Sequence, residues 1–382
     1  MEPPRKEPNE NTSNGIEQHF KAGVDIRSLS RRTIDDSKTI LGKRYLCRGG
    51  GMWIIAPSGL GKSTLSIQIA ILWSCGKPAF DIKPSKSLRI LVIQAEDDEG
   101  DCIEMSLMID HLRLSEKEKV LVEQNTEIVH CNNLSGSQFI DALKFKLNAA
   151  RLSGKPFDLV IINPYGVFQG QDVSNPSDNT HFLNHLLNPV LSEYDLAAII
   201  IHHTPKTNFT NFDKLNPWDF QYAGAGSANM TNWARAIMVI VPQSVERLFL
   251  FVAAKRGSRL TDWCGAMTRL FSWSDNQDII MWINPSEEQR AKKADGDNQR
   301  QNPNYKPDSE KIFTACLSPI EWRHFVQIHE LVIHAWPGYG VNRLKEVLKA
   351  GVHDGFLELS KSNGSLGEKT KPFDLWRRNN TH

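Results

Sequence analysis

The stretch Ala56–Thr64, APSGLGKST, has the residue types and spacing of a loop that binds phosphate. It fits the pattern G-x-x-x-x-G-K-[ST], except that Ala56 takes the place of the first glycine. In such a loop the backbone N–H groups from Ser58 to Ser63 point inward at the phosphates. A glycine-rich turn that only joins a strand to a helix is the alternative. Because strand, loop, Lys, Ser and helix coincide here, the sequence predicts nucleotide binding.

Individual residues of this loop have separate expected roles. Lys62 would reach the β- and γ-phosphates, Ser63 would give its hydroxyl to Mg²⁺, and Thr64 could hydrogen-bond the α-phosphate. ATP and Mg²⁺ are therefore the expected cofactors, with Ser63 at the metal. The residues of the loop expected to hold the cofactor are Ser58, Gly59, Leu60, Gly61, Lys62, Ser63 and Thr64.

Three further positions could act on a bound nucleotide. Glu96 follows a strand-like apolar run and could polarise a water for attack on the γ-phosphate, although a solvated acidic loop fits it equally well. His202 and His203 end another apolar run, where a polar side chain could sense that phosphate. Lys255 and Arg256 end a late strand and could reach a nucleotide held by a neighbouring subunit. A structural histidine and an exposed basic strand end are the alternatives.

Short apolar runs alternate with helical stretches from about Asp25 to Asn284. Continuous runs rich in Ile and Val suit strands that are covered on both faces, as in a parallel sheet. The sequence therefore predicts an α/β fold with a mostly parallel sheet and helices on both faces, followed by an antiparallel tail. Pro189 is expected to break one of the helices. The clearest strand candidates are Met52–Pro57, Leu88–Gln94, Phe157–Asn163 and Leu196–His203.

Composition limits the classes of protein that remain. The 382 residues allow two domains and a large core, and 40% hydrophobic with 23% charged residues is ordinary for a globular protein. A net charge of +1 does not indicate a nucleic-acid binder, although it can conceal a basic channel. Six scattered cysteines, without a C-x-x-C pair, favour neither zinc nor disulfides. This cysteine usage fits a reducing cytosol, so a cytoplasmic protein is expected, and no apolar run is long enough to span a membrane.

Together these features resemble the RecA-like ATPases, and among them the RepA-type hexameric replicative helicases of plasmids and phages, a group of AAA-type ATPases. The resemblance implies a ring of six RecA-like domains, ATP bound between subunits and single-stranded DNA moved through the centre, in replication of a mobile element. It covers roughly Ile40 to Asn284. The segments that carry it are GGGMWIIAPSGLGKST, ILVIQAEDDEG, LVIINPYGVFQGQDVSNPSDNTHFL, AAIIIHHTPK, GAGSANMTNWARA and AAKRGSR.

The resemblance also implies roles for single residues. Glu96 would be the catalytic glutamate and His203 the sensor of the γ-phosphate. Lys255 and Arg256 would be the finger pair that acts across the subunit interface, although the usual spacer between them is missing. Arg235 matches a family arginine less closely. The implied catalytic set is Glu96, Lys62, His203, Arg256 and Lys255.

The resemblance places Asn163 beside Ser63 at the metal and among the residues that hold the cofactor. Asn163 departs from the family pattern, however, in which the third strand ends in Asp-Pro. The Asp normally holds Mg²⁺ through a water shared with the phosphate-loop hydroxyl. Asn can accept a hydrogen bond from such a water but brings no negative charge. Affinity for Mg²⁺ is expected to fall while ATP binding through Lys62 survives. A slower enzyme, an ATP-binding clamp or regulator, and a substitution peculiar to this sequence all fit. Asp172, just beyond the strand, could compensate.

The sequence divides into four predicted parts: a disordered tail (1–24), a RecA-like ATPase domain (25–284), a polar linker (285–310) and a small C-terminal α+β unit (311–382). The last part reads as helix, helix and β-ribbon, the order of a winged-helix domain, with Ser318 and Pro319 at the start of its first helix. A helical cap that only packs or oligomerises fits equally well. Basic residues on the second helix, Arg343, Lys345 and Lys349, could contact duplex DNA, but a solvated helix face is the more ordinary interpretation.

Three functions are compatible with these motifs in different degrees. The first is an ATP-dependent helicase or translocase that acts on single-stranded DNA as a homo-hexamer. The second is an initiator or regulator that senses ATP, hydrolyses it weakly or not at all, and grips duplex DNA through the C-terminal unit. A small-molecule kinase is disfavoured, because no basic lid for a phosphorylated acceptor follows the second strand. The stretch Asn208–Asp219 is expected to contact DNA.

Overall fold

A computed structural model describes residues 25–31, 36–204, 219–222, 228–260, 263, 267–274, 279–301, 312–313, 316–317, 323–336, 339–353, 356–365 and 370–378. The chain divides into two units, residues 1–38 and 39–382. In the first unit, helix α2 (Ile26–Ser30) begins at Asp25, whose carboxylate accepts a hydrogen bond from the Ser28 N–H at 2.8 Å. A 3₁₀ turn, η1 (Asp36–Lys38), follows it.

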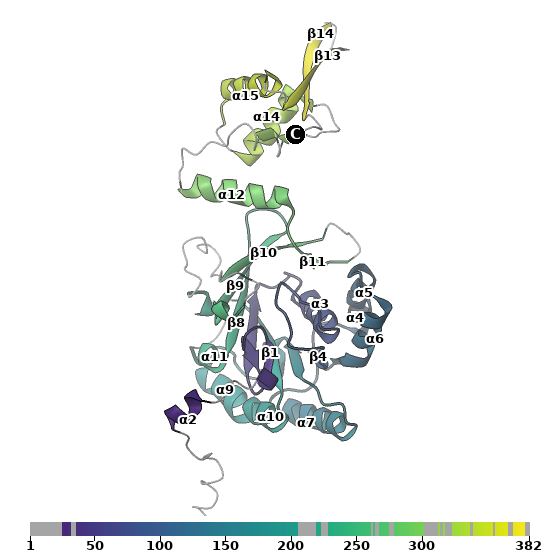
Figure 1. The fold of residues 1–382 in the computed structure, drawn as a ribbon, viewed down its shortest axis with the longest axis vertical. Helices are drawn as coiled ribbons and strands as arrows, with labels where there is room; N and C mark the ends of the chain where they lie inside the picture. The colour runs from purple at the N-terminus through teal and green to yellow at the C-terminus, as the bar shows by residue number, and fades with distance from the viewer. Residues whose placement is uncertain are drawn as a thin grey trace, which may run out of the picture. The chain divides into compact units, whose positions relative to one another are not determined.

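Most of the second unit is built on a nine-stranded sheet in the order β11-β10-β9-β8-β3-β7-β6-β4-β5 (Figure 1). Strands β5, β4, β6, β7, β3 and β8 are parallel to one another, and β9, β10 and β11 are antiparallel. The predicted mostly parallel sheet and its antiparallel tail are therefore confirmed. The strands are β3 (Gly51–Ala56), β4 (Ile90–Gln94), β5 (Thr126–His130), β6 (Leu159–Asn163), β7 (Ala197–His203), β8 (Ala236–Pro242), β9 (Leu248–Lys255), β10 (Thr268–Trp273) and β11 (Trp282–Ile283).

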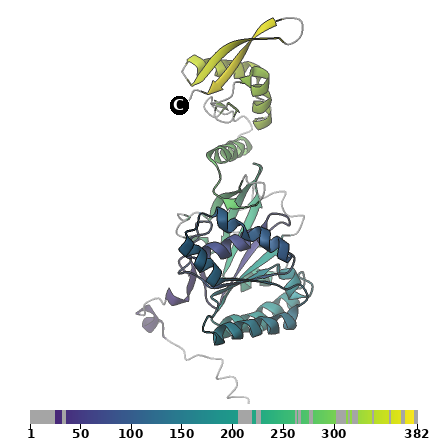
Figure 2. The ribbon, with the colours of Figure 1, turned by 90° about the vertical axis from the view of Figure 1, so that its right-hand side faces the viewer.

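Helices cover both faces of this sheet (Figure 2). On one face, strand side chains such as Met52 and Ile54 pack with α3 (Lys62–Ser74), α5 (Met108–His111) and α6 (Glu116–Asn125). On the other face, Trp53 and Ile55 pack with helices that lie later in the chain. Alternate residues of a strand point to opposite faces, so a strand buried on both must be apolar throughout. The later helices are α7 (Gly136–Leu152), α8 (Tyr165–Gln169), α9 (Pro176–Thr180), the π-helix η2 (His181–Leu187), α10 (Asn188–Glu193) and α11 (Ala228–Trp233).

The prediction that Pro189 breaks its helix is wrong. The chain stays helical from Pro176 to Glu193, and Pro189 lies in the first turn of α10. Proline lacks an N–H group and its ring crowds the carbonyl four residues earlier. The π-helical winding of η2, directly before α10, changes the spacing of those carbonyls. The proline therefore alters the winding of the helix without ending it.

The polar stretch 285–310 is predicted as a linker, but much of it forms helix α12 (Glu287–Gln301). The helix starts with a reciprocal cap, in which the Gln289 N–H donates to Ser286 Oγ and the Ser286 N–H donates to Gln289 Oε1, both at 3.1 Å. Lys292 also pairs with Glu288 one turn earlier, at 2.7 Å. Residues such as Glu, Gln, Lys and Ala favour helix even where no apolar face exists. The lack of large apolar residues in this stretch therefore reflects an exposed helix and not an absence of secondary structure.

The C-terminal residues have a small core of their own around Ile328, Val332 and Leu348. Helices α14 (Phe325–Ala335) and α15 (Val341–His353) precede the strand pair β13 (Leu357–Ser365) and β14 (Thr370–Arg378), which also pairs with β12 (Arg323–His324). This is the predicted order of helix, helix and β-ribbon. The start of α14 differs from the prediction, because His324 caps it and Ser318 and Pro319 lie outside the described residues. The winged-helix assignment and the domain boundaries remain predictions.

None of the helices in the described part of the chain is long and apolar enough to cross a membrane.

Candidate nucleotide site

The carboxyl ends of four parallel strands meet around a cavity of about 290 Å³. Strand β3 runs into the phosphate loop, while Glu96, Asn163 and His203 stand at or just beyond the ends of β4, β6 and β7. Residues far apart in the sequence come together because parallel strands end on the same edge of the sheet. The lining residues are Ser58, Gly59, Gly61, Lys62, Ser63, Thr64, Glu96, Asp97, Asp101, Glu104, Met105, Asn163 and His203. The side chain of Leu60, also predicted to hold the cofactor, packs against the hydrophobic core, so only its backbone is left for the phosphates.

The phosphate loop owes its shape to two glycines in the left-handed region. Gly59 has φ of +77° and Gly61 has φ of +63°, a conformation that is strained for residues with a Cβ. Gly61 directly precedes α3, and its carbonyl accepts the first helical hydrogen bond, from the Leu65 N–H at 2.9 Å. The backbone therefore turns sharply into the helix, so the free N–H groups of its first turn can face a phosphate.

Lys62 is buried, and its ammonium group donates to the carbonyl oxygen of Pro57 at 2.6 Å. Burial lowers the pKa of Lys62 to about 8, and the nearby carboxylate of Glu96 opposes this shift. A lysine that is costly to charge in the free protein gains a counter-ion when a phosphate binds. The geometry thus holds a cation ready for phosphate at neutral pH, where Lys62 is still mostly protonated.

Asn163 takes part in a chain of buried amides and hydroxyls beside the loop. Its Nδ2 donates to Ser63 Oγ at 3.0 Å and to Gln94 Oε1 at 2.5 Å. Gln94 Nε2 in turn lies 3.2 Å from Ser66 Oγ, and Ser66 Oγ donates to the Ser63 carbonyl at 2.7 Å. The amide therefore occupies a lone pair of the Ser63 hydroxyl, the group expected to bind Mg²⁺.

The protein groups beside the loop would bind Mg²⁺ only weakly. It prefers oxygen ligands and usually keeps several waters, with one or two carboxylates and the phosphates of the substrate. Ser63 and Asn163 supply a hydroxyl and an amide without charge, so the phosphates of ATP would have to hold most of the ion. Among the described residues, no group of three or more His, Cys, Asp or Glu side chains is arranged to hold a metal.

His203 and Glu96 face each other across the cavity, with Nε2 and Oε1 4.0 Å apart. Burial, and then the charge of Lys62, lowers the pKa of His203, so its imidazole is neutral at neutral pH. Within the described part of the chain, its Nδ1 has no hydrogen-bond partner. His202 is different, because it is buried on the other face of β7 against the rings of Trp53 and Tyr165. Only His203 lines the cavity.

Comparison with known proteins agrees with this geometry. A family model described as AAA domain matches residues 20–208, which include the phosphate loop and the ends of β4, β6 and β7. The core has the fold of a P-loop domain, a mostly parallel sheet with helices on both faces and a phosphate loop between β3 and α3. No curated protein matches the sequence significantly.

The chain is also similar to solved structures, at low sequence identity. One of them, an ATPase domain, has a TM-score of 0.45 at 10% identity, over 74% of this chain and 100% of that one. A KaiC-like protein, PH0186 from Pyrococcus horikoshii OT3, has a TM-score of 0.39 at 14% identity, over 63% of this chain and 91% of that one.

Several residues that line the cavity were not predicted from the sequence. Asp101, Glu104 and Met105 come from α4 (Glu99–Ser106), and Asp97 directly precedes the Asp98 cap of that helix. A signal was present, since Asp98 and Asp101 form a reciprocal cap and so predict a helix start. A helix that begins there would have placed its acidic residues beside the phosphate loop. Gln94 gave no signal, because it ends an otherwise apolar strand.

Trp282 of β11 is another residue beside the phosphate loop that the sequence did not predict. Its backbone exchanges hydrogen bonds with the Gln68 side chain at 2.7 and 2.9 Å, and its indole N–H donates to the Gly61 carbonyl at 3.3 Å. The antiparallel tail thereby holds both α3 and the phosphate loop. Asp172 does not line the cavity, contrary to the idea that it compensates for Asn163. Its carboxylate instead accepts hydrogen bonds from Ser174, at 2.8 Å from the backbone N–H and 2.7 Å from the hydroxyl.

Lys255, Arg256 and Arg235 lie at the opposite edge of the sheet from the phosphate loop. Strand β9 is antiparallel, so Lys255 at its carboxyl end pairs with Ile237 near the amino end of β8. Lys255 Nζ donates to the carbonyl oxygens of Thr231 and Ala234, at 2.7 and 2.6 Å, at the end of α11. These cations therefore do not reach the cavity of their own chain.

Proposed function

We propose that the chain is an ATP-driven motor of the helicase type, which hydrolyses ATP at the interfaces of a homo-hexamer and moves single-stranded DNA, in replication of a mobile element. The observation that carries this proposal is the division of the predicted residues between two edges of one sheet. Lys62, Ser63, Glu96 and His203 share the phosphate cavity, whereas Arg256 is at the opposite edge. A second copy would be needed to bring both groups to one nucleotide.

The proposed chemistry uses the groups of the cavity as follows. Glu96 takes a proton from the attacking water, and Lys62 neutralises charge on the β- and γ-phosphates. The neutral imidazole of His203 hydrogen-bonds the γ-phosphate and registers its loss. Ser63 would help to hold Mg²⁺, which would supply further neutralisation of the phosphates.

Arginines near Arg256 support action on a neighbour's nucleotide. Burial, and then the guanidinium groups of Arg235 and Arg259, lowers the pKa of Arg256. Its Nη1 lies 3.4 Å from the Arg44 carbonyl, which keeps the side chain close to the same edge. Crowded cations gain most from an anion that enters between them, and a γ-phosphate is such an anion. Arg256 is the proposed finger, while Lys255 braces the end of α11.

A second candidate is an ATP-sensing initiator or regulator with weak or no hydrolysis, which holds duplex DNA through residues 311–382. The orientation of the Asn163 amide favours it. In the free protein Asn163 donates a hydrogen bond to Ser63 Oγ, and so competes with Mg²⁺ for that oxygen. A protein that binds ATP but positions the metal poorly would act through occupancy of the site.

The motor is tested by ring formation and strand separation. The chain with ATP should sediment as a hexamer and unwind a forked DNA duplex. Arg256→Gln should keep ATP binding but lose unwinding, whereas Arg290→Gln, an exposed arginine of α12, should retain both. A monomer that protects a duplex site with little turnover would instead favour the regulator. A chain that forms no ring, unwinds nothing and binds no DNA would contradict both.

A further inference from the structure

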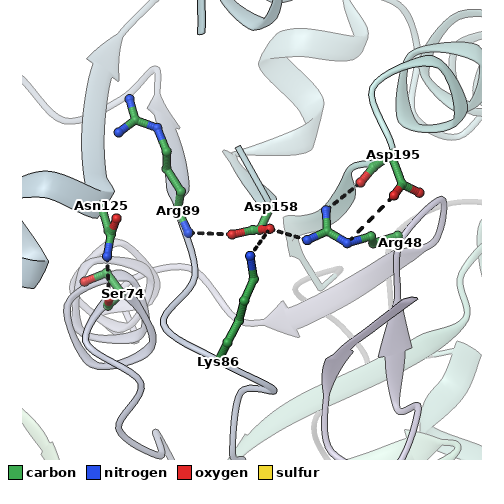
Figure 3. Close-up of polar contacts among 7 residues, drawn as sticks. All are labelled: Arg48, Ser74, Lys86, Arg89, Asn125, Asp158 and Asp195. Carbon is green, nitrogen blue, oxygen red and sulfur yellow. Dashed lines mark hydrogen bonds and ion pairs between the residues drawn. The ribbon is translucent and has the colours of Figure 1, made fainter. Parts of the chain in front are cut away.

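A second concave site lies at the edge of the sheet opposite the phosphate loop. Residues directly before three strands contribute to it: Arg89 before β4, Asn125 before β5 and Asp158 before β6 (Figure 3). With Arg48 and neighbouring loops they enclose a cavity of about 500 Å³. Volumes of this size accommodate a small ligand. The cavity is separate from the nucleotide site, because five-residue strands put the two edges about 16 Å apart.

Asp158 is the anchor of this amino-edge pocket. It is only 6% exposed, and its carboxylate accepts hydrogen bonds from the Arg89 N–H at 2.9 Å, from Lys86 Nζ at 3.0 Å and from the Arg48 guanidinium. Burial alone would raise the pKa of Asp158, but these donors outweigh burial and lower it. The charged carboxylate therefore draws two cationic side chains from different loops to one point (Figure 3).

The pocket keeps an excess of positive charge after this pairing. Four cations line it, Arg48, Lys86, Arg89 and Lys155, against two carboxylates, Asp158 and Asp195. Arg48 also donates to the Asp195 carbonyl at 2.8 Å, which fixes its plane. The excess is two positive charges on the lining; Glu127, just outside the lining, lies 3.9 Å from Arg89 Nη2 but is shared with Lys146.

Arg89 and the two lysines are placed to use that excess. The Arg89 guanidinium extends away from Asp158, lies 4.8 Å over the ring of Phe157 and donates to the Gln124 carbonyl at 2.8 Å (Figure 3). Its fork is thereby held rigid at the pocket wall. The side chain of Lys86 is 57% exposed, and Lys155 is exposed as well. Lys155 can turn from the rim towards a ligand at little cost, whereas Lys86 must exchange its contact with the Asp158 carboxylate for one with the ligand.

We propose that this amino-edge pocket binds a phosphate group, carried either by a small phosphorylated molecule or by a nucleic-acid strand. A phosphate monoester carries about two negative charges near neutral pH, which matches the excess of the lining. A fixed guanidinium plane beside mobile ammonium groups is the donor set that suits phosphate oxygens. Asp158 keeps its role as the anchor, because Arg48 and the Arg89 N–H continue to satisfy it. The proposal does not depend on hydrolysis at the phosphate loop.

The test uses the full chain carrying Lys62→Ala, so that the phosphate loop contributes little to binding. Two probes are titrated: pyrophosphate by calorimetry, and a labelled oligothymidylate of about twelve nucleotides by fluorescence anisotropy. At least one should bind, and Lys86→Ala with Lys155→Ala should weaken it by about tenfold or more. For the oligonucleotide, the slope of log affinity against log salt should become shallower by about 1.4. Pyrophosphate binding identifies a small ligand, and oligonucleotide binding alone identifies a strand.

The matched control replaces Lys83 and Lys117, two exposed lysines that do not line the pocket. Lys83 lies three residues from Lys86 in the same loop, so this pair removes the same net charge from nearby surface. It should change either affinity by less than about twofold. Binding of neither probe, or an equal loss in both double variants, would overturn the proposal. Equal thermal unfolding midpoints for the variants would establish that all of them are folded.

Discussion

Asn163→Asp should raise the affinity for Mg²⁺ in the presence of ATP. Asn163 is 2% exposed and its Nδ2 donates to Ser63 Oγ at 3.0 Å. A carboxylate at this place can only accept, so the Ser63 hydroxyl must donate its proton to Asp and leave its lone pairs for the metal. Gln94 would turn its Nε2 towards the new carboxylate, as a buried acceptor requires a donor. The substitution thus removes the competitor for Mg²⁺ and adds a charge.

The magnitude follows from Coulomb's law. A unit charge pair at 4 Å is worth about 1 kcal/mol even in water, so a divalent ion and a carboxylate at that distance gain about 2 kcal/mol. This corresponds to about a thirtyfold tighter Mg²⁺ site. The shielded position of residue 163 makes the attraction larger, while removal of water from the buried carboxylate opposes it. Without Mg²⁺, the same carboxylate should weaken ATP binding through repulsion of the phosphates.

The assay is binding of a fluorescent ATP analogue at increasing Mg²⁺ concentration. The midpoint in Mg²⁺ should fall by about thirtyfold in Asn163→Asp. Asn132→Asp makes the same chemical change at an exposed position and should leave the midpoint unchanged. An unaltered midpoint in a folded Asn163→Asp protein would refute the reasoning, because the amide would then have no influence on the metal.

Three further predictions concern the same cavity. Nucleotide affinity should fall as pH rises through about 8, the pKa of Lys62 in the free chain, because a neutral amine attracts phosphate less; titrations from pH 6.5 to 9.5, in steps of about half a unit, test this. Glu96→Gln should lower ATP turnover by about a hundredfold or more with ATP affinity kept, as steady-state kinetics beside binding would establish. Gln94→Leu should lower the free energy of unfolding by about 1–3 kcal/mol in urea titrations, because it leaves Asn163 and Ser66 with an unmet buried partner.

A different result would contradict each of these three predictions. A nucleotide affinity that is constant from pH 7 to 9.5, the range about the pKa of Lys62, would mean that another group carries the phosphates. In the chain without nucleotide, Lys62 has its ordinary pKa of 10.5 when unfolded and a pKa of about 8 when folded. The unfolded state therefore binds more protons between these values, so the free energy of unfolding should rise with pH from about 8 to 10.5. Turnover that survives in Glu96→Gln would assign the base to another carboxylate of the cavity, such as Asp97. Unchanged stability of Gln94→Leu would mean that water replaces the lost amide.

The sheet and most of the cavity could be predicted from sequence because their signals are local. Strands covered on both faces must be apolar at every position, and the phosphate loop needs glycine, lysine and serine at fixed spacing. Once the strands were recognised as parallel, Glu96, Asn163 and His203 had to meet at one edge. Only His203, and not His202, lines the cavity, since neighbours on a strand point to opposite faces.

The features that the sequence did not predict depend on contacts between residues far apart in the chain, or belong to an exposed helix. Trp282 reaches Gly61 across more than half of the chain, and no spacing in the sequence announces that contact. Gln94 ends a strand like any polar residue, and its pairing with Asn163 appears only when β4 and β6 lie side by side. Helix α12 has no apolar stripe, so helix propensity and capping alone marked it. The stretch Asn208–Asp219 is predicted to contact DNA, but all of it except Asp219 lies outside the described residues, and that prediction stays open.

Steady-state ATP hydrolysis with and without single-stranded DNA, at several Mg²⁺ concentrations and beside Asn163→Asp, tests the proposed motor most directly. The proposal predicts turnover that DNA stimulates in the chain as it stands, with a demand for Mg²⁺ that Asn163→Asp lowers. Turnover that only Asn163→Asp restores would mean that the natural chain binds ATP without using it. No turnover in either protein, at any Mg²⁺ concentration, would contradict the motor and leave the ATP-sensing regulator.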